Sequence, residues 1–315
     1  MKIAHFRQRM VLPTLLLISL FLHPGKAKSQ QDPIYTQYMT NLLSIQPAYA
    51  GISGVLSISA LSRAQWVGWE GAPNSNTFTM HFPMKSFNVG LGLSLVNDKW
   101  GPILQNGLYA DYAYRIALKP RQYLALGIKA GFNTYHARFT DLELDDPIDP
   151  SFAQNVDFKM LPNAGFGFLW HSDLFFLGAS MPKMFKNSIV DDSENRVYKE
   201  VLHAYAMGGY VFFLSQNAKL KPTFLYRWSE QTPSYVDLSA NILLYDRVWF
   251  GATYRVKNSY ALIFQFNVNN QLRFGYSFDL TTFHDNQVNS GTHEFTINYE
   301  FQSTRRNRRY AARYF

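Results

Sequence analysis

The chain has 315 residues, of which 47% are hydrophobic and 17% aromatic, and its mean hydropathy is −0.18. This composition excludes a disordered chain, which would be poor in aromatic residues, and a bundle of membrane helices, which needs apolar runs of about 20 residues. The net charge of +8 comes from the basic residues of 1–29 and 305–313, so the body of the chain gives no support for nucleic-acid binding.

The first 29 residues have the pattern of a secretory signal peptide. Basic residues precede an apolar stretch from Val11 to Leu22, which is too short to cross a membrane. Ala27 and Ser29 fit a signal peptidase site, so we expect the mature chain to begin at Gln30. The chain has no cysteine, which excludes a lipid-anchored cysteine and a disulfide framework.

Period-two alternation of apolar and polar side chains dominates the mature chain. In Gln271–Leu280 one parity carries large apolar residues such as Phe274, and the other carries Arg273, Ser277 and Asp279. Strict alternation predicts strands with two unlike faces. We expect about fourteen strands, which begin near Gly54, Ser75, Phe87, Gln105, Gln122, Pro162, Asp173, Val201, Lys219, Ser234, Arg247, Ser259, Gln271 and Gly291.

The length and polarity of these segments favour a membrane barrel over a soluble sandwich. Most are close to the 9 to 11 residues that a tilted strand needs to cross a bilayer. Their apolar faces are aromatic, which suits lipid, and their polar faces are charged, which suits a lumen. The inward charged residues are Asp111, Arg115, Lys129, Arg227, Asp237, Arg255, Arg273, Glu294 and Glu300. The predicted fold is all-β, a single transmembrane antiparallel β-barrel of about 14 strands with an N-terminal periplasmic segment.

Long and short connections alternate along the predicted strands. The long links are 64–74, 97–104, 136–161, 182–200, 229–233 and 281–290, and the exception on that side is the short link at Lys257–Asn258. Outer-membrane barrels have long outer loops and short periplasmic turns, so both termini are expected in the periplasm. We divide the chain into a signal peptide (1–29), an N-terminal segment (30–52), the barrel (53–301) and a basic tail (302–315). The tyrosine-rich stretch Gln31–Tyr49 is expected to line the periplasmic mouth or to plug the lumen.

Several motifs in this order resemble the PorP/SprF family of outer-membrane proteins from Bacteroidota. They begin with Asp32–Met39 and Gln46–Gly51 and extend over essentially the whole mature chain. The others are Arg63, Gln65-Trp66, Gly71–Pro73, Val89–Ser94, Asn97-Asp98, Tyr112–Arg115, Gly127–Gly131, Leu220–Pro222 and Ser290–Glu294. The chain departs from the family at Gln46, where asparagine is common, and in the arginine-rich tail beyond Phe301.

The resemblance implies a component of type IX secretion and gliding motility. The implied role is non-enzymatic: to support export or cell-surface attachment of a large adhesin-like cargo that carries a C-terminal sorting domain. The implied partners are other secretion components, this cargo and outer-membrane lipid. A small-solute porin is the alternative, for which the charged lumen would be the selectivity surface, and a membrane hydrolase is a more distant one. The residues contain no catalytic constellation, and we expect no cofactor and no metal.

Three groups of residues are candidates for partner contact. Arg63, Gln65, Trp66 and Trp69 join a guanidinium to indoles in the first outer loop, where an interface anchor and a membrane-interface girdle are both plausible. Tyr35, Tyr38 and Tyr49 form a tyrosine-rich surface that either docks a partner or seals the barrel. Arg305, Arg306, Arg308 and Arg309 in the tail suit an anionic partner or lipid, or a solvated end.

Acidic residues suggest two further interpretations. The acidic loop 141–149 has oxygen ligands suited to calcium, but its prolines and spacing favour a solvated loop, as they do for Asp191, Asp192 and Glu194. Glu294 and Glu300 lie about 20 Å apart by strand rise, which is too far for a catalytic pair. We expect them to pair with Arg273 and Arg255 across the lumen.

Overall fold

The computed structural model describes residues 33–84, 88–141, 155–190, 196–281 and 290–301. Its regular structure is almost all β, with four short 3-10 helices: η1 (Tyr38–Thr40), η2 (Leu42–Ser44), η3 (Pro47–Tyr49) and η4 (Phe139–Asp141). The strands are β1 (Ser57–Ala64), β2 (Asn74–Pro83), β3 (Val89–Trp100), β4 (Ile103–Lys119), β5 (Gln122–Ala137), β6 (Val156–Ser172), β7 (Phe175–Met181), β8 (Ser188–Val190), β9 (Arg196–Lys199), β10 (His203–Tyr210), β11 (Phe212–Phe213), β12 (Ala218–Ser229), β13 (Tyr235–Leu244), β14 (Val248–Arg255), β15 (Ser259–Asn267), β16 (Leu272–Thr281) and β17 (Thr292–Glu300). Within the described ranges, no helix is long and apolar enough to span a membrane.

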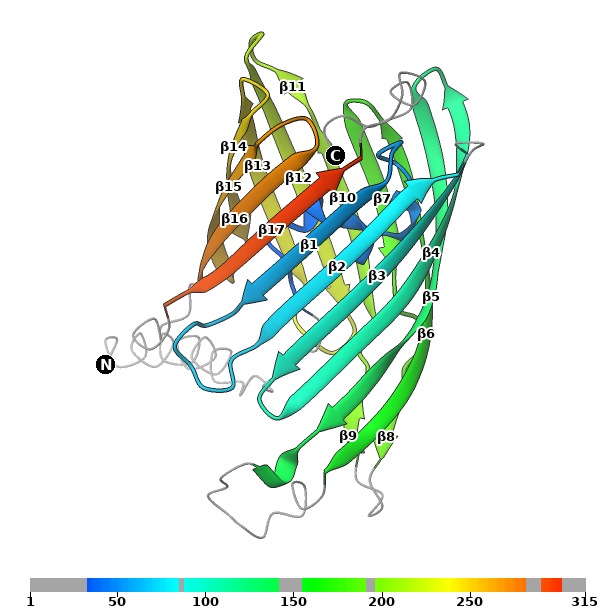
Figure 1. The fold of residues 1–315 in the computed structure, drawn as a ribbon, viewed down its shortest axis with the longest axis vertical. Coiled ribbons are helices and arrows are strands. Elements are labelled where there is room, and N and C mark those ends of the chain that lie inside the picture. Colours follow the sequence, from blue (N-terminus) through cyan, green and yellow to red (C-terminus); the bar gives the residue numbers. More distant parts are fainter. Residues whose placement is uncertain (1–32, 85–87, 142–154, 191–195, 282–289, 302–315) are drawn as a thin grey trace, which may run out of the picture. The chain divides into compact units, whose positions relative to one another are not determined.

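Fourteen antiparallel strands close into one barrel (Figure 1). β10 and β11 act as a single strand interrupted at Val211, because both pair with β12. The first strand pairs with the last, from Ser57 opposite Glu300 to Ala64 opposite His293. Closure removes the sheet edges, so the backbone groups of the spanning strands find partners in neighbouring strands, as a hydrocarbon environment requires. The predicted all-β barrel of about fourteen strands is confirmed.

Each spanning strand presents one row of side chains outward and the other row inward. In β16, Phe274 is 42% exposed on the outer surface, whereas Ser277 and Asp279 are buried on the lumen side. The outer row of the barrel is rich in exposed aromatic and aliphatic residues, and the inner row holds most of the buried charges. This is the parity that the alternation in the sequence predicts.

The two ends of the barrel differ in their connections. At the short-turn end the links are 84–88, 120–121, 173–174, 214–217, 245–247 and 268–271. At the long-loop end they are 65–73, 138–155, 182–202, 230–234 and 282–291, together with tight turns at 101–102 and 256–258. The long-loop end points downward in Figure 1 and carries the β8–β9 hairpin.

Two of the expected long links are shorter than predicted. The expected loop 97–104 is mostly strand, because Asn97 pairs with Asn106 and donates a 2.7 Å hydrogen bond to its side-chain oxygen. β6 begins at Val156, six residues before the expected start at Pro162. Val156 and Leu161 belong to a second hydrophobic cluster with Tyr135, Ile189 and Tyr198, which extends β5 and β6 and holds the β8–β9 hairpin.

Residues 33–56 lie inside the barrel, and we call them the plug. The blue segment in Figure 1 contains η1, η2 and η3 and is surrounded by the strands. Plug residues, among them Leu42, Leu43 and Ala48, form one hydrophobic cluster with wall residues such as Leu169 and Met207. The lumen is therefore filled by packed side chains over the length of this cluster.

The plug crosses the lumen from the long-loop end to the short-turn end. Pro33 lines a small cavity with Asp98 and Gln105, which flank the tight turn at 101–102. The plug then leads into β1, which begins opposite Glu300 at the short-turn end. The described chain therefore begins near the long-loop end and ends at the short-turn end. Residues 1–32 and 302–315 lie outside the described residues, so the periplasmic location of both termini stays a prediction.

Replacing Phe274 with arginine should hinder insertion of the barrel. Its side chain faces outward in the first half of β16, and a charge on the lipid face costs up to roughly 2–4 kcal/mol, the value at the bilayer midplane. We expect a lower yield of folded barrel for Phe274→Arg in a heat-modifiability assay, whereas Phe274→Leu should insert normally. Equal yields for both variants would mean that this face does not contact lipid.

Candidate functional site

A buried carboxylate on the last strand holds the start of the plug. Glu294 of β17 accepts hydrogen bonds from the backbone N–H groups of Thr36 (3.0 Å) and Gln37 (2.7 Å). The Gln37 side chain in turn donates to the backbone oxygen of Glu294 at 3.2 Å. Hydrogen bonds to a charged acceptor are shorter and stronger than neutral ones. Glu294 is 0% exposed, so these bonds do not compete with bulk water.

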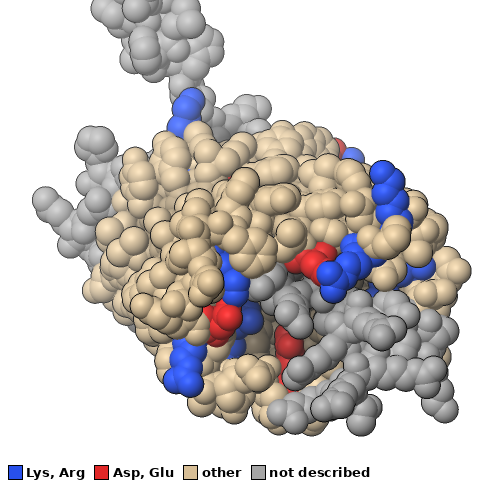
Figure 2. Space-filling model, turned by 90° about the horizontal axis from the view of Figure 1, so that it is seen from above, with Lys and Arg blue, Asp and Glu red and all other residues tan. Residues whose placement is uncertain are grey.

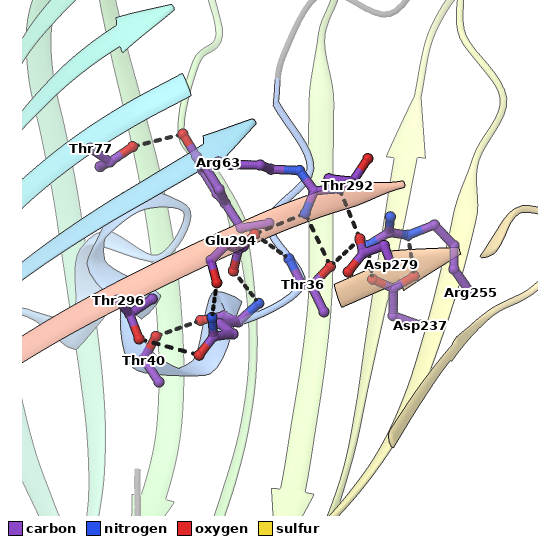
Figure 3. Close-up of polar contacts among 12 residues, drawn as sticks. Thr36, Thr40, Arg63, Thr77, Asp237, Arg255, Asp279, Thr292, Glu294 and Thr296 are labelled. Carbon is purple, nitrogen blue, oxygen red and sulfur yellow. Dashed lines mark hydrogen bonds and ion pairs between the residues drawn. The ribbon is translucent and has the colours of Figure 1, made fainter. Parts of the chain in front are cut away.

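Arg63 connects this carboxylate to a second one. Its guanidinium lies 2.9 Å from Glu294 and 2.9 Å from Asp279 of β16, and it donates to the Thr36 hydroxyl at 3.2 Å. The Thr36 hydroxyl also donates to Asp279 at 2.5 Å. Figure 3 shows these groups converging on the plug from three adjacent strands. We call Thr36, Gln37, Arg63, Asp279 and Glu294 the latch.

The ion pairs of the lumen follow the register of the sheet. Arg63 lies directly opposite Glu294 in the pairing of β1 with β17. Asp237 lies opposite Arg255, which binds it through two 2.8 Å hydrogen bonds, and Asp111 lies opposite Lys129 at 2.9 Å. The expected pairing of Glu294 with Arg273 or Arg255 is therefore wrong, because directly opposed residues are the nearest neighbours in a sheet. The Nε of Arg273 donates to Asn267 at 2.8 Å, and the charge of Arg273 acts on Glu300, the other glutamate expected to pair with these arginines.

The Gln46–Gly51 motif packs against a wall that has no side chains at the points of contact. A Cβ at Gly127 of β5 would lie 2.2 Å from the backbone nitrogen of Ala48, and one at Gly90 of β3 would lie 2.0 Å from the carbonyl oxygen of Ala50. Gln46 itself donates to the carbonyl oxygens of Phe168 and Ala179, both at 3.2 Å. The inward glycines thus allow the plug backbone to approach the strands closely.

The tyrosines of the plug face the barrel wall. The hydroxyl of Tyr35 hydrogen-bonds to Thr77 at 2.7 Å, and that of Tyr38 donates to Thr223 at 3.2 Å. The ring of Tyr49 lies edge-on to that of His81, with centroids 5.2 Å apart. All three tyrosines are buried. They seal and orient the plug, and they offer little surface to a docking partner.

The first long loop, residues 65–73, is tied to two other loops. Val67 donates to the carbonyl of Gly291 (3.0 Å) and accepts from Ser290 (2.8 Å), and Gly101 donates to the carbonyl of Gly71 (2.8 Å). These bonds fix the loop over the rim of the barrel. Trp66 and Trp69 are 37% and 48% exposed there.

The structure separates the four residues near this loop that were predicted to contact a partner. Arg63 is not part of the exposed rim, because it belongs to β1 and its guanidinium is buried in the latch. Gln65 is half-buried at the base of the loop, where its backbone N–H donates to Pro73 at 2.9 Å. Trp66 and Trp69 remain the exposed members, and their contact with a partner stays a prediction.

A second cluster of buried polar side chains, which we call the hub, lies at the long-loop end. The buried carboxylate of Glu200 accepts from the side-chain amides of Asn133 (2.9 Å), Asn163 (2.9 Å) and Asn187 (2.7 Å). The oxygen of Asn163 also accepts from the backbone of Met184 at 2.8 Å. This hub folds the segment after β7 against β5 and β6. It joins residues that are distant in sequence, and periodicity gives no signal for it.

The short-turn end contains a cavity of about 400 Å³. It is lined by plug residues such as Asn41 and Tyr49, and by His81, Trp249 and Arg273 of the wall. Figure 2, which views the barrel from this end, shows acidic and basic side chains around a central opening. The tail arginines Arg305, Arg306, Arg308 and Arg309, residues 142–149 of the acidic loop, and Asp191, Asp192 and Glu194 lie outside the described residues.

Breaking the latch should loosen the plug without opening the sheet. Glu294→Ala leaves two backbone amides of the plug without their buried acceptor and removes one of the two carboxylates bound to Arg63, and removing one partner of a buried ion pair costs about 3–5 kcal/mol. We expect an engineered cysteine at Thr40 to react faster with a soluble maleimide in the Glu294→Ala barrel.

Asp237→Ala is the matched control for this experiment. It breaks an equally buried wall pair with Arg255, and Asp237 has no hydrogen bond to the plug. It should reduce stability but leave the reactivity at position 40 unchanged. Equal acceleration in both variants would show that plug accessibility follows general stability and not the latch.

Residues 27–299 match the protein family described as type IX secretion system membrane protein PorP/SprF. No curated protein matches the chain in sequence. Among solved structures, the chain is similar to the CymD monoaromatic hydrocarbon channel, with 10% identity, a TM-score of 0.47 and coverage of 86% of this chain and 94% of that one. It is also similar to the toluene transporter TodX of P. putida (8% identity, TM-score 0.46, coverage 84% and 95%) and to Omp33 of Acinetobacter baumannii (9%, 0.45, 79% and 100%). Identities this low concern the fold and carry no information about function.

Proposed function

This chain belongs to the PorP/SprF family of type IX secretion system membrane proteins, and we propose that it is a non-enzymatic outer-membrane partner for one large secreted protein. In this proposal it supports the export or the cell-surface attachment of an adhesin-like cargo of the gliding type. The cargo's C-terminal sorting domain binds at the long-loop end, and other type IX components complete the assembly.

The filled lumen is the observation that carries this proposal over the porin alternative. A porin needs a water-filled channel, whereas a hydrophobic cluster of plug and wall residues occupies this lumen. The latch holds the start of the plug, and the glycine-lined wall of β3 and β5 contacts the Gln46–Gly51 part of it. A barrel that keeps its lumen closed is suited to present a surface rather than to conduct solutes.

The long-loop rim supports a docking role. Its first loop is held by backbone hydrogen bonds to two neighbouring loops, so little conformational entropy is lost when a partner binds. It exposes Trp66 and Trp69, and tryptophan is enriched among residues that dominate binding energy. A membrane-interface girdle would place indoles at the same height, so binding must be tested directly.

Surface proteomics of a deletion strain tests the proposed function. We expect one large adhesin to disappear from the cell surface, while general type IX export of soluble enzymes continues. A normal set of surface adhesins together with lost uptake of a small solute would contradict the secretion role and favour a porin.

The tryptophans of the first loop should matter more than its charge. In the complemented deletion strain, Trp66→Ala with Trp69→Ala should reduce cargo display at least tenfold, because truncation of anchor residues typically costs 2 kcal/mol or more. Glu70→Ala, an exposed change in the same loop, should have little effect because solvated carboxylates contribute little. Unchanged display in the double variant would assign the indoles to the membrane interface.

The long-loop end is expected to face the cell exterior. Single cysteines at Ser188 and Ser290, which are exposed at that end, should react with an impermeant maleimide on intact cells. A cysteine at Ser215, exposed in a short turn, should react only after the outer membrane is permeabilised. Labelling of position 215 on intact cells would reverse this orientation.

A further inference from the structure

The outer surface of the barrel is hollowed where β13, β14, β15 and β16 lie side by side, on the left of Figure 1. Ala240 and Ala252 oppose each other across β13 and β14, and both are exposed on the outer row. Leu262 lies opposite Ala252, and Phe278 lies opposite Leu262, so larger side chains follow the two alanines across the sheet. The result is a hollow of about 400 Å³, whose outward-facing lining residues are all aliphatic or aromatic.

Aromatic pairs flank the hollow along the strands. Toward the long-loop end, Tyr254 lies opposite Tyr260, and their rings stack with centroids 4.9 Å apart. Toward the short-turn end, Phe250 lies opposite Phe264, and their ring centroids are 5.3 Å apart. Aromatic pairs at such distances attract each other, so the hollow is bounded by side chains that hold one another in place.

An acyl chain of a membrane lipid is the occupant that this position favours. The hollow lies on the row of side chains that faces hydrocarbon, where lipid tails are the molecules at hand. An empty hollow would deprive its lining of dispersion contacts, which a flexible chain restores by following the surface. Tyrosine rings lie where hydrocarbon meets the headgroups, so Tyr254 and Tyr260 put the headgroup of such a lipid near the turn between β14 and β15.

A cation stands at this turn. Lys257 is exposed in the tight turn 256–258, three residues after Tyr254, which is about 10 Å by strand rise. Its backbone is left-handed, with φ 58°, a conformation that glycine adopts more easily, so the turn itself does not need a lysine. Because this link is the short exception at the long-loop end, β14 and β15 place no long loop over the ammonium group. A lysine ammonium binds phosphate as a point charge.

We propose that this hollow, together with the tyrosine pair and Lys257, is a binding site for one anionic membrane lipid. An acyl chain of the lipid lies in the hollow beside Ala240 and Ala252, and its headgroup phosphate binds Lys257. The site is on the outer surface of the barrel and uses neither the latch nor the tryptophan rim. It goes beyond the proposed secretion role and is tested on the purified protein, so its failure leaves that role intact.

Native mass spectrometry of the full-length protein in detergent tests this site. The probes are phosphatidylglycerol, which is anionic, and phosphatidylcholine, which is zwitterionic. The wild type should retain one phosphatidylglycerol about fivefold better than phosphatidylcholine, because a lysine near the membrane surface favours an anionic lipid by about that factor. Lys257→Gln should lower the retention of phosphatidylglycerol to that of phosphatidylcholine. Ala252→Phe fills the hollow and should lower the retention of both lipids about fivefold, because the acyl chain loses its contacts.

Two matched variants separate this site from general contact with lipid. Lys99→Gln removes an exposed cation at the long-loop end of β3, and Ala130→Phe enlarges an exposed alanine on the outer face of β5. Each should change lipid retention less than about twofold. If Ala252→Phe does not fold, Ala252→Leu takes its place as a smaller filling of the hollow.

Four results would each overturn the proposal. The first is equal retention of the two lipids by the wild type, and the second is a loss in Lys99→Gln or Ala130→Phe as large as in its counterpart. The third is a dimeric mass without bound lipid, which would assign the hollow to a second copy of the chain. The fourth is displacement of phosphatidylglycerol by an equal concentration of glycerol phosphate, because a free phosphate does not use the hollow.

Discussion

One cross-strand ion pair stabilises both the closed barrel and the plug inside it. Arg63 and Glu294 face each other where the first strand meets the last, so their ion pair forms only when the sheet closes. The same carboxylate accepts the backbone of Thr36 and Gln37, so the plug is fixed to the seam of the barrel. Closure of the sheet gives every backbone N–H and C=O group of the spanning strands a hydrogen-bond partner within the membrane. At the Arg63–Glu294 pair, closure also brings in the buried carboxylate that positions the plug.

The fold could be predicted from the sequence because each barrel strand is recognised by the alternation within one short segment of the chain. The alternation around Phe274 and Ser277 assigns each residue to a face, and fourteen such segments give the strand count. Register is not local, which explains the wrong partners for Glu294: its opposite residue, Arg63, lies 231 positions away along the chain. The loop expected at 97–104 failed for a related reason, since Asn97 and Asp98 favour turns in isolation but gain cross-strand partners in Asn106 and Ser75.

The candidate site was only partly visible in the sequence. Trp66 and Trp69 stand out by residue type, and the structure leaves them exposed. Arg63 stood beside them in sequence but points the other way, because alternation at the end of β1 turns it into the lumen. Asn163 and Glu200 carried no signal, since an amide and a carboxylate become a hub only when folding brings them within 2.9 Å of each other.

The direction of the plug has a consequence for biogenesis. Thr36 lies near the beginning of the described chain, yet its acceptor on β17 lies 258 residues later. Contacts of such separation form late, because loop closure has to precede them. Until the final strand is in place, apolar plug residues such as Leu42 and Leu43 have no lumen in which to be buried. The assembling chain therefore needs protection at its leading end, as well as along its strands, and seating of the plug marks the completion of the barrel.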